Sequence, residues 1–552
     1  MNRFTLIVVL SLAATMARGA DKPAPTGKTK KPAPAPVVIG NEVTAERELT
    51  LEKHYLLLPV KTGEGKKARK SRTSLIIDGA VVREFDIDLA NPAEWYAHLD
   101  VSAWRGRKAT LRAKQLPEAA KTALDLVTQS DAIWNADQVY KEPLRAQLHF
   151  SPRRGWNNDP NGMVYADGEY HLYFQHNPYG WHWGNMHWGH AVSRDMVHWT
   201  EAPIALYPPK YGDSAFSGGA VVDKDNTSDW KKGTNSLIVA AYTSTGRGEC
   251  IVYSNDRGRS FQEYEGNPVI KHGGRDPRPF WYEPGKHWVI AVYDEFEKEK
   301  YIAFYTSTDL KKWTFQSRIA GFHECPDLYE LPVGDKKYWV INGASSDYMI
   351  GQFDGKKFTA ETPKIKGHQG RGYYAPQTFS HDPKGRVVQI GWLKTPTPGM
   401  PFNQAMSLPL ELKLRQTADG PRLTWTPVQE LESLRDGPNR ADALANFRAE
   451  LVELRAEFDS DVTFTVRGVT ISYDAAKQEI GVNNHRAPAP LVDGKQRIIV
   501  YVDRTALEVF ASDGLTYVPL PFTPKPDDQS VSVTGGKVKS LQVYKLKSCW
   551  QP

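Results

Sequence analysis

The chain has 552 residues, a formal net charge of +6 at neutral pH and 3 cysteines. This composition excludes a wholly disordered chain, a collagen, a multi-span membrane protein and a disulfide scaffold, and the small excess of base does not predict a nucleic-acid partner. Aromatic residues make up 11% of the chain, which is typical of a β-rich fold, of a sugar-binding surface, or of both.

The first 39 residues are not expected to belong to a folded domain. Residues 1–20 combine a basic start, an apolar run and a small-x-small pattern. These features predict a signal peptide, against the alternative of a buried N-terminal helix. Residues 21–39 are rich in proline and lysine and predict an extended linker. We therefore expect a secreted or periplasmic protein without a membrane span.

Residues 40–142 contain alternating apolar and polar runs separated by turn signals. This pattern predicts an N-terminal accessory β-rich domain, with one short helix in residues 116–130. The basic run at residues 66–70 is either a contact for an anionic surface or a solvated loop, and we favour the loop.

Residues 143–415 are short aromatic-rich strands with a recurring marker, an aspartate followed by an aromatic residue. The aspartates are Asp195, Asp256, Asp309 and Asp354, spaced 61, 53 and 45 residues apart. Each marker predicts a hairpin turn whose aromatic residue packs onto its own sheet. Repeats of this size predict a five-bladed β-propeller, and the alternative is a set of unrelated hairpins in a sandwich. Residues 416–552 predict a C-terminal β-sandwich, so the expected fold class is all-β.

Three carboxylates occur in similar local settings. Asp159 and Asp276 each precede a proline, and Glu324 stands two residues before one. Each is expected where a strand gives way to a tight turn. They belong to different repeats, and the inner strands of a propeller converge, so the three acids are expected to meet in one pocket. Paired carboxyls are the groups that glycoside cleavage uses, whereas ordinary turns are the alternative interpretation.

Residues 170–199 add a dense set of aromatic and histidine side chains. The segment holds Trp181, Trp183, Trp188 and Trp199, together with His171, His176, His182, His187, His190 and His198. A zinc site is one interpretation, but no metal-binding spacing accompanies the histidines. We favour a sugar site in which aromatic faces stack on a ring while Gln175, Asn185 and histidines bond its hydroxyls. Core packing is the alternative, and we expect it for Trp199 and His198.

Taken together, these motifs resemble glycoside hydrolase family 32, the invertase, levanase and inulinase family. The matching motifs are WNNDPNG at 156–162, Gln175, WGNMHWGH at 183–190, FSG at 216–218, RDP at 275–277, ECP at 324–326 and YAPQ at 374–377. They occur in the family's order over roughly residues 149–406. The resemblance implies a five-bladed propeller followed by a β-sandwich, which agrees with the interpretation of the repeats.

The resemblance also implies roles for the matching residues. Asp159 would be the nucleophile that attacks C2 of a β-fructofuranosyl unit, and Glu324 would be the acid/base. Asp276, beside Arg275, would bind fructose hydroxyls and stabilise the transition state. The implied lining of the fructose subsite is Asn158, Gln175, Trp183, Phe216, Ser217, Arg275 and Trp392. No cofactor and no metal are implied.

Two positions depart from the family pattern. Asn157 stands where the family usually has an apolar residue, and Gly372 stands where it often has an aspartate, so a sugar contact is expected to be lost. Residues 40–142 lie outside the family core. This accessory domain either binds polymer or braces the propeller, and we favour bracing.

The three cysteines are expected to pack as small apolar side chains without a functional disulfide. They are Cys250, Cys325 and Cys549. Cys325 adjoins Glu324, where it is expected to help keep that carboxyl protonated.

The leading hypothesis is a secreted, retaining exo-β-fructosidase that hydrolyses terminal β-D-fructofuranosyl residues of levan, inulin or sucrose. The substrate is then the expected partner, with neither nucleic acid nor a membrane involved. The alternatives are a fructosyltransferase that uses the same covalent intermediate, a non-catalytic fructan-binding protein, and a related five-bladed hydrolase of arabinose polymers.

Overall fold

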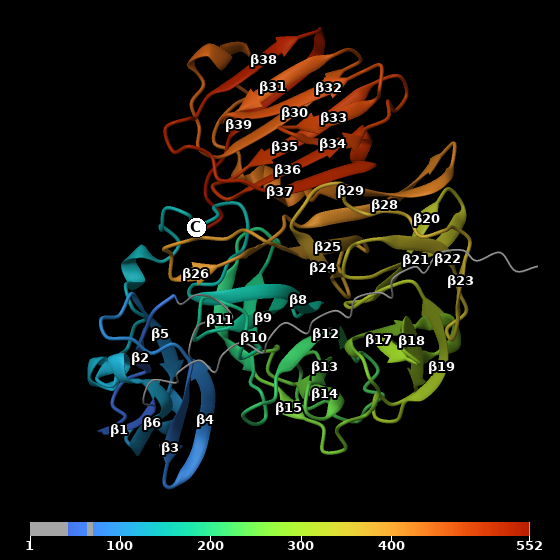
Figure 1. Cartoon of the computed structure of the whole chain (residues 1–552). Helices are drawn as coiled ribbons and strands as arrows, with labels where there is room; N and C mark the ends of the chain where they lie inside the picture. The colour runs from blue at the N-terminus through green and yellow to red at the C-terminus, as the bar shows by residue number, and fades with distance from the viewer. Residues whose placement is uncertain (1–41, 63–69, 551–552) are drawn as a thin grey trace, which may run out of the picture. The chain divides into compact units, whose positions relative to one another are not determined.

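A computed structural model of the chain describes residues 42–62 and 70–550 (Figure 1). The described part is built from β-strands and short 3-10 helices, which confirms the all-β prediction. The predicted signal peptide, the linker and nearly all of the basic run lie outside the described residues. Within the described ranges, no helix is long and apolar enough to cross a membrane.

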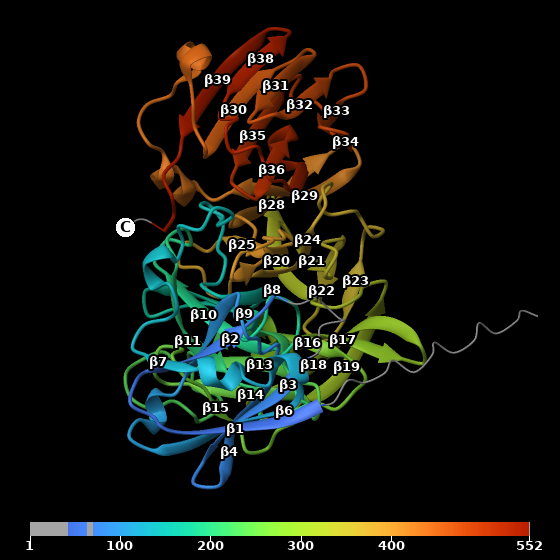
Figure 2. The same cartoon turned by 60° about the vertical axis from the view of Figure 1, so that its left-hand side comes forward.

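The N-terminal region packs two antiparallel sheets around one apolar core (Figure 2). The first sheet has the order β1 (Glu42–Thr50), β6 (Lys108–Pro117), β3 (Ser71–Ile77), β4 (Ala80–Ile87). The second has the order β5 (Trp95–Asp100), β2 (Tyr55–Val60), β7 (Thr128–Ser130). Alternating burial along β5 places every second side chain in this core, as the sequence pattern predicts.

The helix expected over residues 116–130 is not formed. Two 3-10 helices, η3 (Glu118–Ala120) and η4 (Ala123–Leu126), occupy part of the segment between β6 and β7. Most apolar residues of the segment are buried, but they are contributed by the end of β6, by the two 3-10 helices and by the link to β7. The remaining 3-10 helices are η2 (Ser102–Trp104), η5 (Ala136–Gln138), η6 (Glu283–Gly285), η7 (Gln429–Leu434), η8 (Ala441–Asn446) and η9 (Ser512–Gly514).

The middle of the chain forms five consecutive sheets. The first has the order β11 (Thr200–Leu206), β10 (His187–Ser193), β9 (Glu169–Asn177), β8 (Gly155–Ala166), β26 (Phe402–Asn403). The second has the order β12 (Ala215–Val222), β13 (Ile238–Ser244), β14 (Gly248–Ser254), β15 (Gln262–Glu263). The third has the order β16 (Arg275–Tyr282), β17 (His287–Phe296), β18 (Glu299–Ser307), β19 (Thr314–Ala320).

The last two of these sheets follow the same sequential pattern. The fourth has the order β20 (Asp327–Val333), β21 (Lys336–Asn342), β22 (Tyr348–Phe353), β23 (Phe358–Ala360). The fifth has the order β24 (Tyr373–Thr378), β25 (Val387–Leu393), β28 (Leu410–Thr417), β29 (Gly420–Pro427), and β27 (Ala405–Met406) also pairs with β25. Residue 416, where the C-terminal domain was expected to begin, therefore lies inside β28.

The repeated aspartate markers form the turns between the third and fourth strands of the first four sheets. In each turn, one carboxylate oxygen accepts two backbone N–H groups, for example those of Val197 and His198 at Asp195. Asp256, Asp309 and Asp354 bond in the same way. The aromatic residue that follows each turn packs against an apolar core, as predicted.

Apolar cores join each of the five sheets to the next. One core contains residues of the first and second sheets, another of the second and third, and another of the third and fourth. A larger core joins the fourth, fifth and first sheets. The innermost strand β8 contacts both β12 and β24, and β12 contacts β16. The first strands of neighbouring sheets thus lie side by side, which brings residues distant in sequence together.

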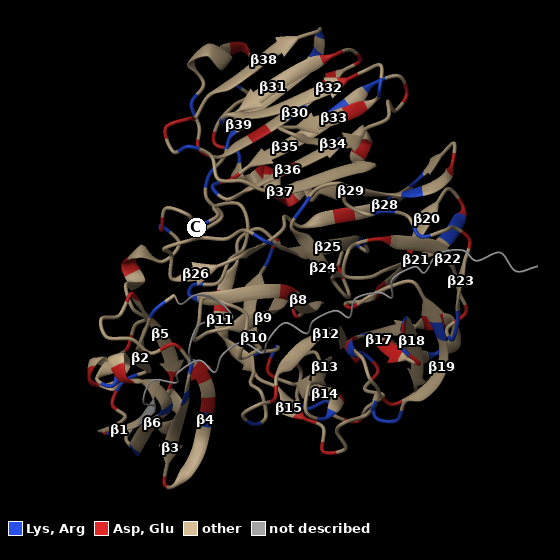
Figure 3. Ribbon diagram, viewed as in Figure 1, with Lys and Arg blue, Asp and Glu red and all other residues tan. Residues whose placement is uncertain are grey.

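The C-terminal region stacks two five-stranded sheets over a shared core (Figure 1). One has the order β37 (Thr516–Pro521), β36 (Ala506–Ala511), β35 (Gln496–Val502), β30 (Val452–Phe458), β39 (Val538–Lys545). The other has the order β34 (His485–Pro488), β33 (Glu479–Val482), β32 (Val469–Asp474), β31 (Val462–Val466), β38 (Val531–Gly535). Acidic and basic residues are interspersed along the described strands and loops (Figure 3).

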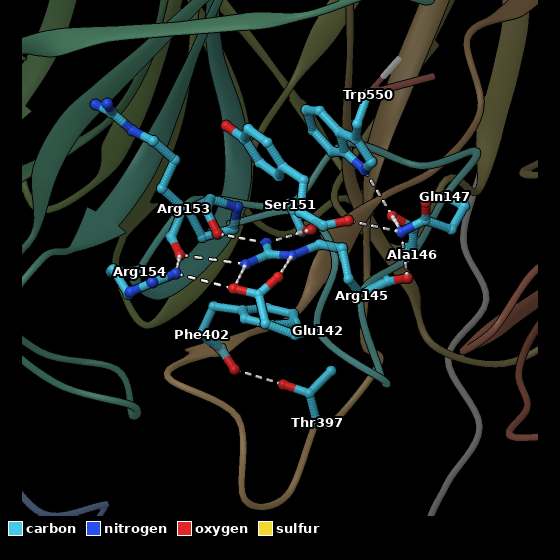
Figure 4. Close-up of polar contacts among 12 residues, drawn as sticks. Glu142, Arg145, Ala146, Gln147, Ser151, Arg153, Arg154, Thr397, Phe402 and Trp550 are labelled. Atoms are coloured by element: carbon cyan, nitrogen blue, oxygen red, sulfur yellow. Dashed lines mark hydrogen bonds and ion pairs between the residues drawn. The ribbon is translucent and has the colours of Figure 1, made fainter. Parts of the chain in front are cut away.

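A buried ion cluster anchors the start of β8 (Figure 4). The carboxylate of Glu142 accepts from Arg145 Nε at 3.0 Å and from Arg154 Nη1 at 2.9 Å. The two arginine side chains are 0% and 1% exposed. Phe402 lies under the Arg145 guanidinium, 3.2 Å from ring centroid to Cζ, and its strand β26 pairs in parallel with β8. The cluster therefore fixes the strand that carries Asp159.

The C-terminal region contributes a second anchor. Asp503 accepts the backbone N–H groups of Gln147 and Leu148 and contacts His149 Nδ1 at 2.7 Å. Nε2 of the same histidine contacts Glu508 at 3.0 Å. Burial lowers the pKa of His149, but its hydrogen bonds to the two carboxylates outweigh burial and raise that pKa to about 9. The histidine is therefore a charged link between two buried acids.

Candidate active site

Three carboxylates from three sheets meet in one place. Asp159 is in β8, Asp276 is in β16, and Glu324 lies just before β20. The thiol of Cys325 lies between two of them, 3.6 Å from Asp159 Oδ2 and 3.4 Å from Asp276 Oδ2. Arg275 bonds Glu324 and lies 3.9 Å from Asp276 Oδ2. One thiol and one guanidinium thus connect all three acids.

The local backbone differs from the predicted strand-to-turn setting. Asp159 lies inside a strand, at a bulge between Asn157 and Pro160. Asp276 is the second residue of β16 and has φ of +67°, while Glu324 has φ of +54°. Left-handed backbone at residues other than glycine costs free energy and is typical of functional sites. Neighbouring hydrogen bonds hold these conformations and re-aim the side chains.

Two donors orient the Asp159 carboxylate. Asn158 Nδ2 donates to Oδ1 at 3.0 Å, and the hydroxyl of Ser217 donates to Oδ2 at 2.8 Å. Burial raises the pKa of Asp159, and the negative charge of Glu324 adds to that rise. The two donors oppose the rise and fix the carboxylate oxygens in position.

Asp276 has the larger perturbation. Burial is the main cause that raises its pKa, to about 7, and the charge of Asp159 is the second. Its carboxylate accepts the N–H of Cys325 at 2.9 Å, and its own N–H donates to Thr243 Oγ1 at 2.9 Å. A buried acid whose pKa is raised by burial and by a neighbouring carboxylate is typical of a catalytic site.

The pKa of Glu324 is lowered, contrary to the expectation that Cys325 helps to keep this carboxyl protonated. Burial raises its pKa, but hydrogen bonds from Arg275 and from Tyr374 together outweigh burial. The Tyr374 hydroxyl donates to Glu324 Oε2 at 2.8 Å. Glu324 is therefore an ionised partner of Arg275. Burial raises the pKa of Cys325 well above its usual range, so it remains a thiol. All three cysteines are free.

The acids open into a cavity of about 440 Å³ with aromatic walls. Its lining comprises Asn158, Asp159, Gln175, Trp183, Phe216, Ser217, Arg275, Asp276, Glu324, Tyr374 and Trp392. All ten site residues predicted from the sequence are among them. Tyr374 was missed, although it begins the YAPQ motif that contributed to the resemblance.

Most histidines of residues 170–199 contact other side chains of the protein and do not line this cavity. His171 and His190 are buried and contact each other, 3.1 Å between Nδ1 and Nε2. His198 contacts Asp195 within a marker turn. Asn185 does not line the cavity of the acids; its side chain bonds the backbone of Asp86 in the N-terminal region. Among the described residues, no group of three or more potential metal ligands is assembled.

The structure shows the surroundings of the two residues that depart from the family pattern, Asn157 and Gly372. Asn157 is fully buried, so it belongs to the packing around β8. Gly372 has φ of +83°, and a Cβ there would lie 3.2 Å from Pro521 Cδ. The chain conformation at this position therefore favours glycine over aspartate.

A polar chain extends behind Asp276. Thr243 accepts the N–H of Asp276 and donates to Glu249 Oε2 at 2.7 Å. Glu249 contacts His272 Nε2 at 2.9 Å, and the other ring nitrogen of that histidine lies 3.2 Å from Asp294. Burial lowers the pKa of His272, but these two carboxylates outweigh burial and raise it. The chain fixes the backbone at Asp276.

A pocket with three interacting carboxylates, a guanidinium and stacking aromatic side chains is that of a carbohydrate-cleaving hydrolase. The profile described as "Glycosyl hydrolases family 32 N-terminal domain" matches residues 149–427. The chain belongs to glycoside hydrolase family 32.

Known proteins agree with this assignment. A levanase of Bacillus subtilis is 38% identical over 489 residues, which cover 74% of this chain and 72% of the relative. An extracellular exo-inulinase of Aspergillus awamori is 29% identical, with 74% of this chain and 96% of the relative covered. The crystal structure of exo-inulinase from Aspergillus awamori aligns with a TM-score of 0.67 at 28% identity, covering 74% of this chain and all of that one.

Proposed function

We propose that the protein is a retaining exo-β-fructosidase that releases terminal fructose from levan, inulin or sucrose. The observation that carries the proposal is the meeting of Asp159, Asp276 and Glu324 in one aromatic-lined pocket. The names of the levanase and exo-inulinase relatives support the choice of substrates.

The proposed reaction has two displacements. In the first, an Asp159 oxygen forms a bond to C2 of the fructosyl unit while the bond from C2 to the leaving oxygen breaks, and Glu324 gives its proton to that oxygen. In the second, water gives a proton to Glu324 and attacks C2, which releases Asp159. Asp276 and Arg275 hold fructose hydroxyls, and the Asp276 carboxylate stabilises the positive charge that develops on the ring.

Protonation of Glu324 is the demanding requirement of this mechanism, since its contacts with Arg275 and Tyr374 lower its pKa. We expect the bound sugar to exclude water and to draw Arg275 toward its hydroxyls, which weakens the guanidinium contact. Both changes favour the neutral carboxyl. A pKa assigned to the acid from kcat should therefore exceed the value assigned from kcat/KM.

The test is fructose release from sucrose, inulin and levan, with Asp159→Asn as the isosteric variant of the nucleophile. We expect a loss of kcat of at least about 1,000-fold, on the scale of removing a nucleophile. Ser228→Ala, a buried hydroxyl that bonds Asp223 outside the pocket, is the matched control for handling and folding. Full activity of the Asp159→Asn variant would show that the nucleophile is misassigned.

Product analysis decides between hydrolysis and transfer. At high sucrose we expect free fructose to dominate and its first-formed anomer to be β, as retention requires. Fructosylated oligosaccharides as the main product would favour the transferase alternative. Binding without turnover on every fructoside would favour a non-catalytic protein.

We also propose that the five consecutive sheets are the blades of a five-bladed propeller over residues 143–427 and that the two C-terminal sheets form a β-sandwich. The cores that join each sheet to the next support this arrangement. We place the boundary after β29 because its sheet continues to Pro427. Residues 40–142 remain a separate accessory domain in this proposal.

Export through a signal peptide at residues 1–20, followed by a tether at 21–39, completes the proposal. An extracellular relative supports it. N-terminal sequencing of protein recovered outside the cytoplasm is the test. If protein recovered outside the cytoplasm still begins at Met1, the proposed cleavage of the signal peptide is wrong.

A further inference from the structure

A second and larger cavity adjoins the catalytic pocket. Its volume is about 1060 Å³, at the upper end of the roughly 300–1,000 Å³ that is usual for small-molecule sites. Trp183 and Trp392 line both this cavity and the pocket of the three acids. The two hollows therefore adjoin at a pair of indole rings.

One wall of this cavity comes from the N-terminal region. Glu84, Phe85 and Asp86 of β4 line it, and Figure 3 shows acidic residues on this strand. These residues precede the segment that matches the family, which starts at residue 149. The wall is thus an addition to the segment that matches the family.

The wall is fixed in place by specific contacts. The Asn185 amide accepts the Asp86 N–H at 2.9 Å and donates to the Asp86 carbonyl at 2.7 Å. Tyr211 donates its hydroxyl to Asp86 Oδ1 at 2.8 Å. Phe85 stacks on Tyr179 with ring centroids 3.8 Å apart. A surface held in this way is preorganised, so a ligand need not order it on binding.

The chemistry of the lining fits a neutral chain of sugars. Trp183 is 52% exposed, and an indole that projects into a hollow offers an apolar face for a ring. Glu84 and Asp86 offer carboxylate acceptors for hydroxyls, while Lys70 and Lys210 lie in the same lining. Charges of both signs around one cavity favour an uncharged polyhydroxyl ligand over a sugar phosphate.

We propose that this cavity binds the leaving-side sugar units of a fructan chain and that β4 makes the enzyme prefer chains to sucrose. The inference rests on the proposed function, because only cleavage at the three acids defines a leaving side. When the terminal fructosyl unit occupies the acid pocket, the rest of the chain passes Trp183 and Trp392. Sucrose has one unit on that side, whereas inulin and levan have many.

The test compares kcat/KM on long-chain inulin, long-chain levan and sucrose for the full-length enzyme and its variants. Asp86→Ala removes an acceptor from the wall. Tyr211→Phe removes the hydroxyl that donates to Asp86 Oδ1 and leaves the ring in the lining, so it tests the same wall by a milder change if Asp86→Ala folds poorly. Glu46→Ala, an exposed residue of β1 in the same domain that pairs with Arg112, is the matched control.

We expect both cavity variants to lower the ratio of kcat/KM on chains to kcat/KM on sucrose by about fivefold, the factor that one hydrogen bond of usual strength produces. The change should appear as a higher KM on chains, and Glu46→Ala should keep the wild-type ratio. Wild-type ratios in both folded variants would overturn the inference and leave the fructosidase proposal standing. A wild-type enzyme that releases no fructose from any of the three substrates would overturn both.

Discussion

Replacing Asp276 by asparagine should stabilise the fold while it damages catalysis, and the gain should depend on pH. Burial and the nearby Asp159 raise the pKa of Asp276 from 3.8 to about 7. At about 1.4 kcal/mol for each tenfold change in proton affinity, this difference corresponds to about 4 kcal/mol. The folded chain binds this proton more tightly than the unfolded chain, so its free energy of unfolding falls as pH rises from about 4 through about 7.

Asparagine carries no charge at any of these pH values, and its side-chain oxygen can still accept the N–H of Cys325. The stability difference between variant and wild type should therefore be close to zero at pH 4 and reach up to about 4 kcal/mol at pH 8. With about 2.1 cal/mol/K of unfolding entropy per residue, this gain corresponds to about 4 °C in Tm for 552 residues.

Calorimetry at pH 4 and pH 8, with fructose release measured in parallel, is the assay. We expect kcat to fall by about 100-fold or more, on the scale of a lost transition-state contact. The matched control is Asp327→Asn, an equally buried aspartate that accepts from Arg278 Nε at 2.8 Å; this variant should lose stability because the guanidinium loses its partner. A Tm gain for Asp276→Asn that is equal at both pH values, or a loss at pH 8, would refute the reasoning.

Three further variants test the surroundings of the acids. Thr243→Val removes the acceptor for the buried N–H of Asp276 and should cost about 1–3 kcal/mol of stability and lower kcat, as denaturant unfolding and kinetics would show. Tyr374→Phe removes a donor that lowers the pKa of Glu324, so that pKa should rise and the alkaline limb of the kcat/KM profile should move to higher pH. Glu142→Gln should cost about 3–5 kcal/mol because two buried guanidiniums lose their carboxylate, and calorimetry would detect it.

Each of these variants has a defined contrary result. Wild-type stability and kcat in Thr243→Val would show that the polar chain does not position Asp276. An unmoved alkaline limb in Tyr374→Phe would show that Glu324 does not supply the proton. Glu118→Gln, which removes an exposed partner of Lys121, is the control for Glu142→Gln, and equal Tm values for the two would refute the role of the buried cluster.

Motif chemistry predicted the lining of the acid pocket well because each motif supplies a residue to the same centre. Asp159 and Asp276 were recognisable from the prolines and turn formers beside them. The protonation state of Glu324 could not be predicted in this way, because it depends on Arg275 and Tyr374, which come from different sheets. No local pattern encodes the position of a guanidinium relative to a carboxylate about fifty residues away in the chain.

The fold was also predictable in part, where local interactions determine the structure. The aspartate markers identify real turns because one carboxylate oxygen accepts two backbone N–H groups, a purely local interaction. The prediction of a helix over residues 116–130 was wrong because the structure of this segment depends on interactions that are not local. Leu116, Leu124 and Val127 are buried with helical spacing, but Leu116 lies in β6, Leu124 in η4, and Val127 between η4 and β7. A burial pattern specifies which side chains face inward, and the backbone has more than one way to place them.

The bond from Asp503 to Gln147 spans 356 residues of chain. All three carboxylates of the acid pocket precede residue 330 in the chain, yet the segment that leads into β8 is held by Asp503, which is synthesised later. Vectorial synthesis thus leaves a nascent chain with all its candidate catalytic groups and without this support for the strand that carries Asp159. Chains truncated after residue 430 should therefore be far less active than the intact protein, although they retain the whole segment that matches the family.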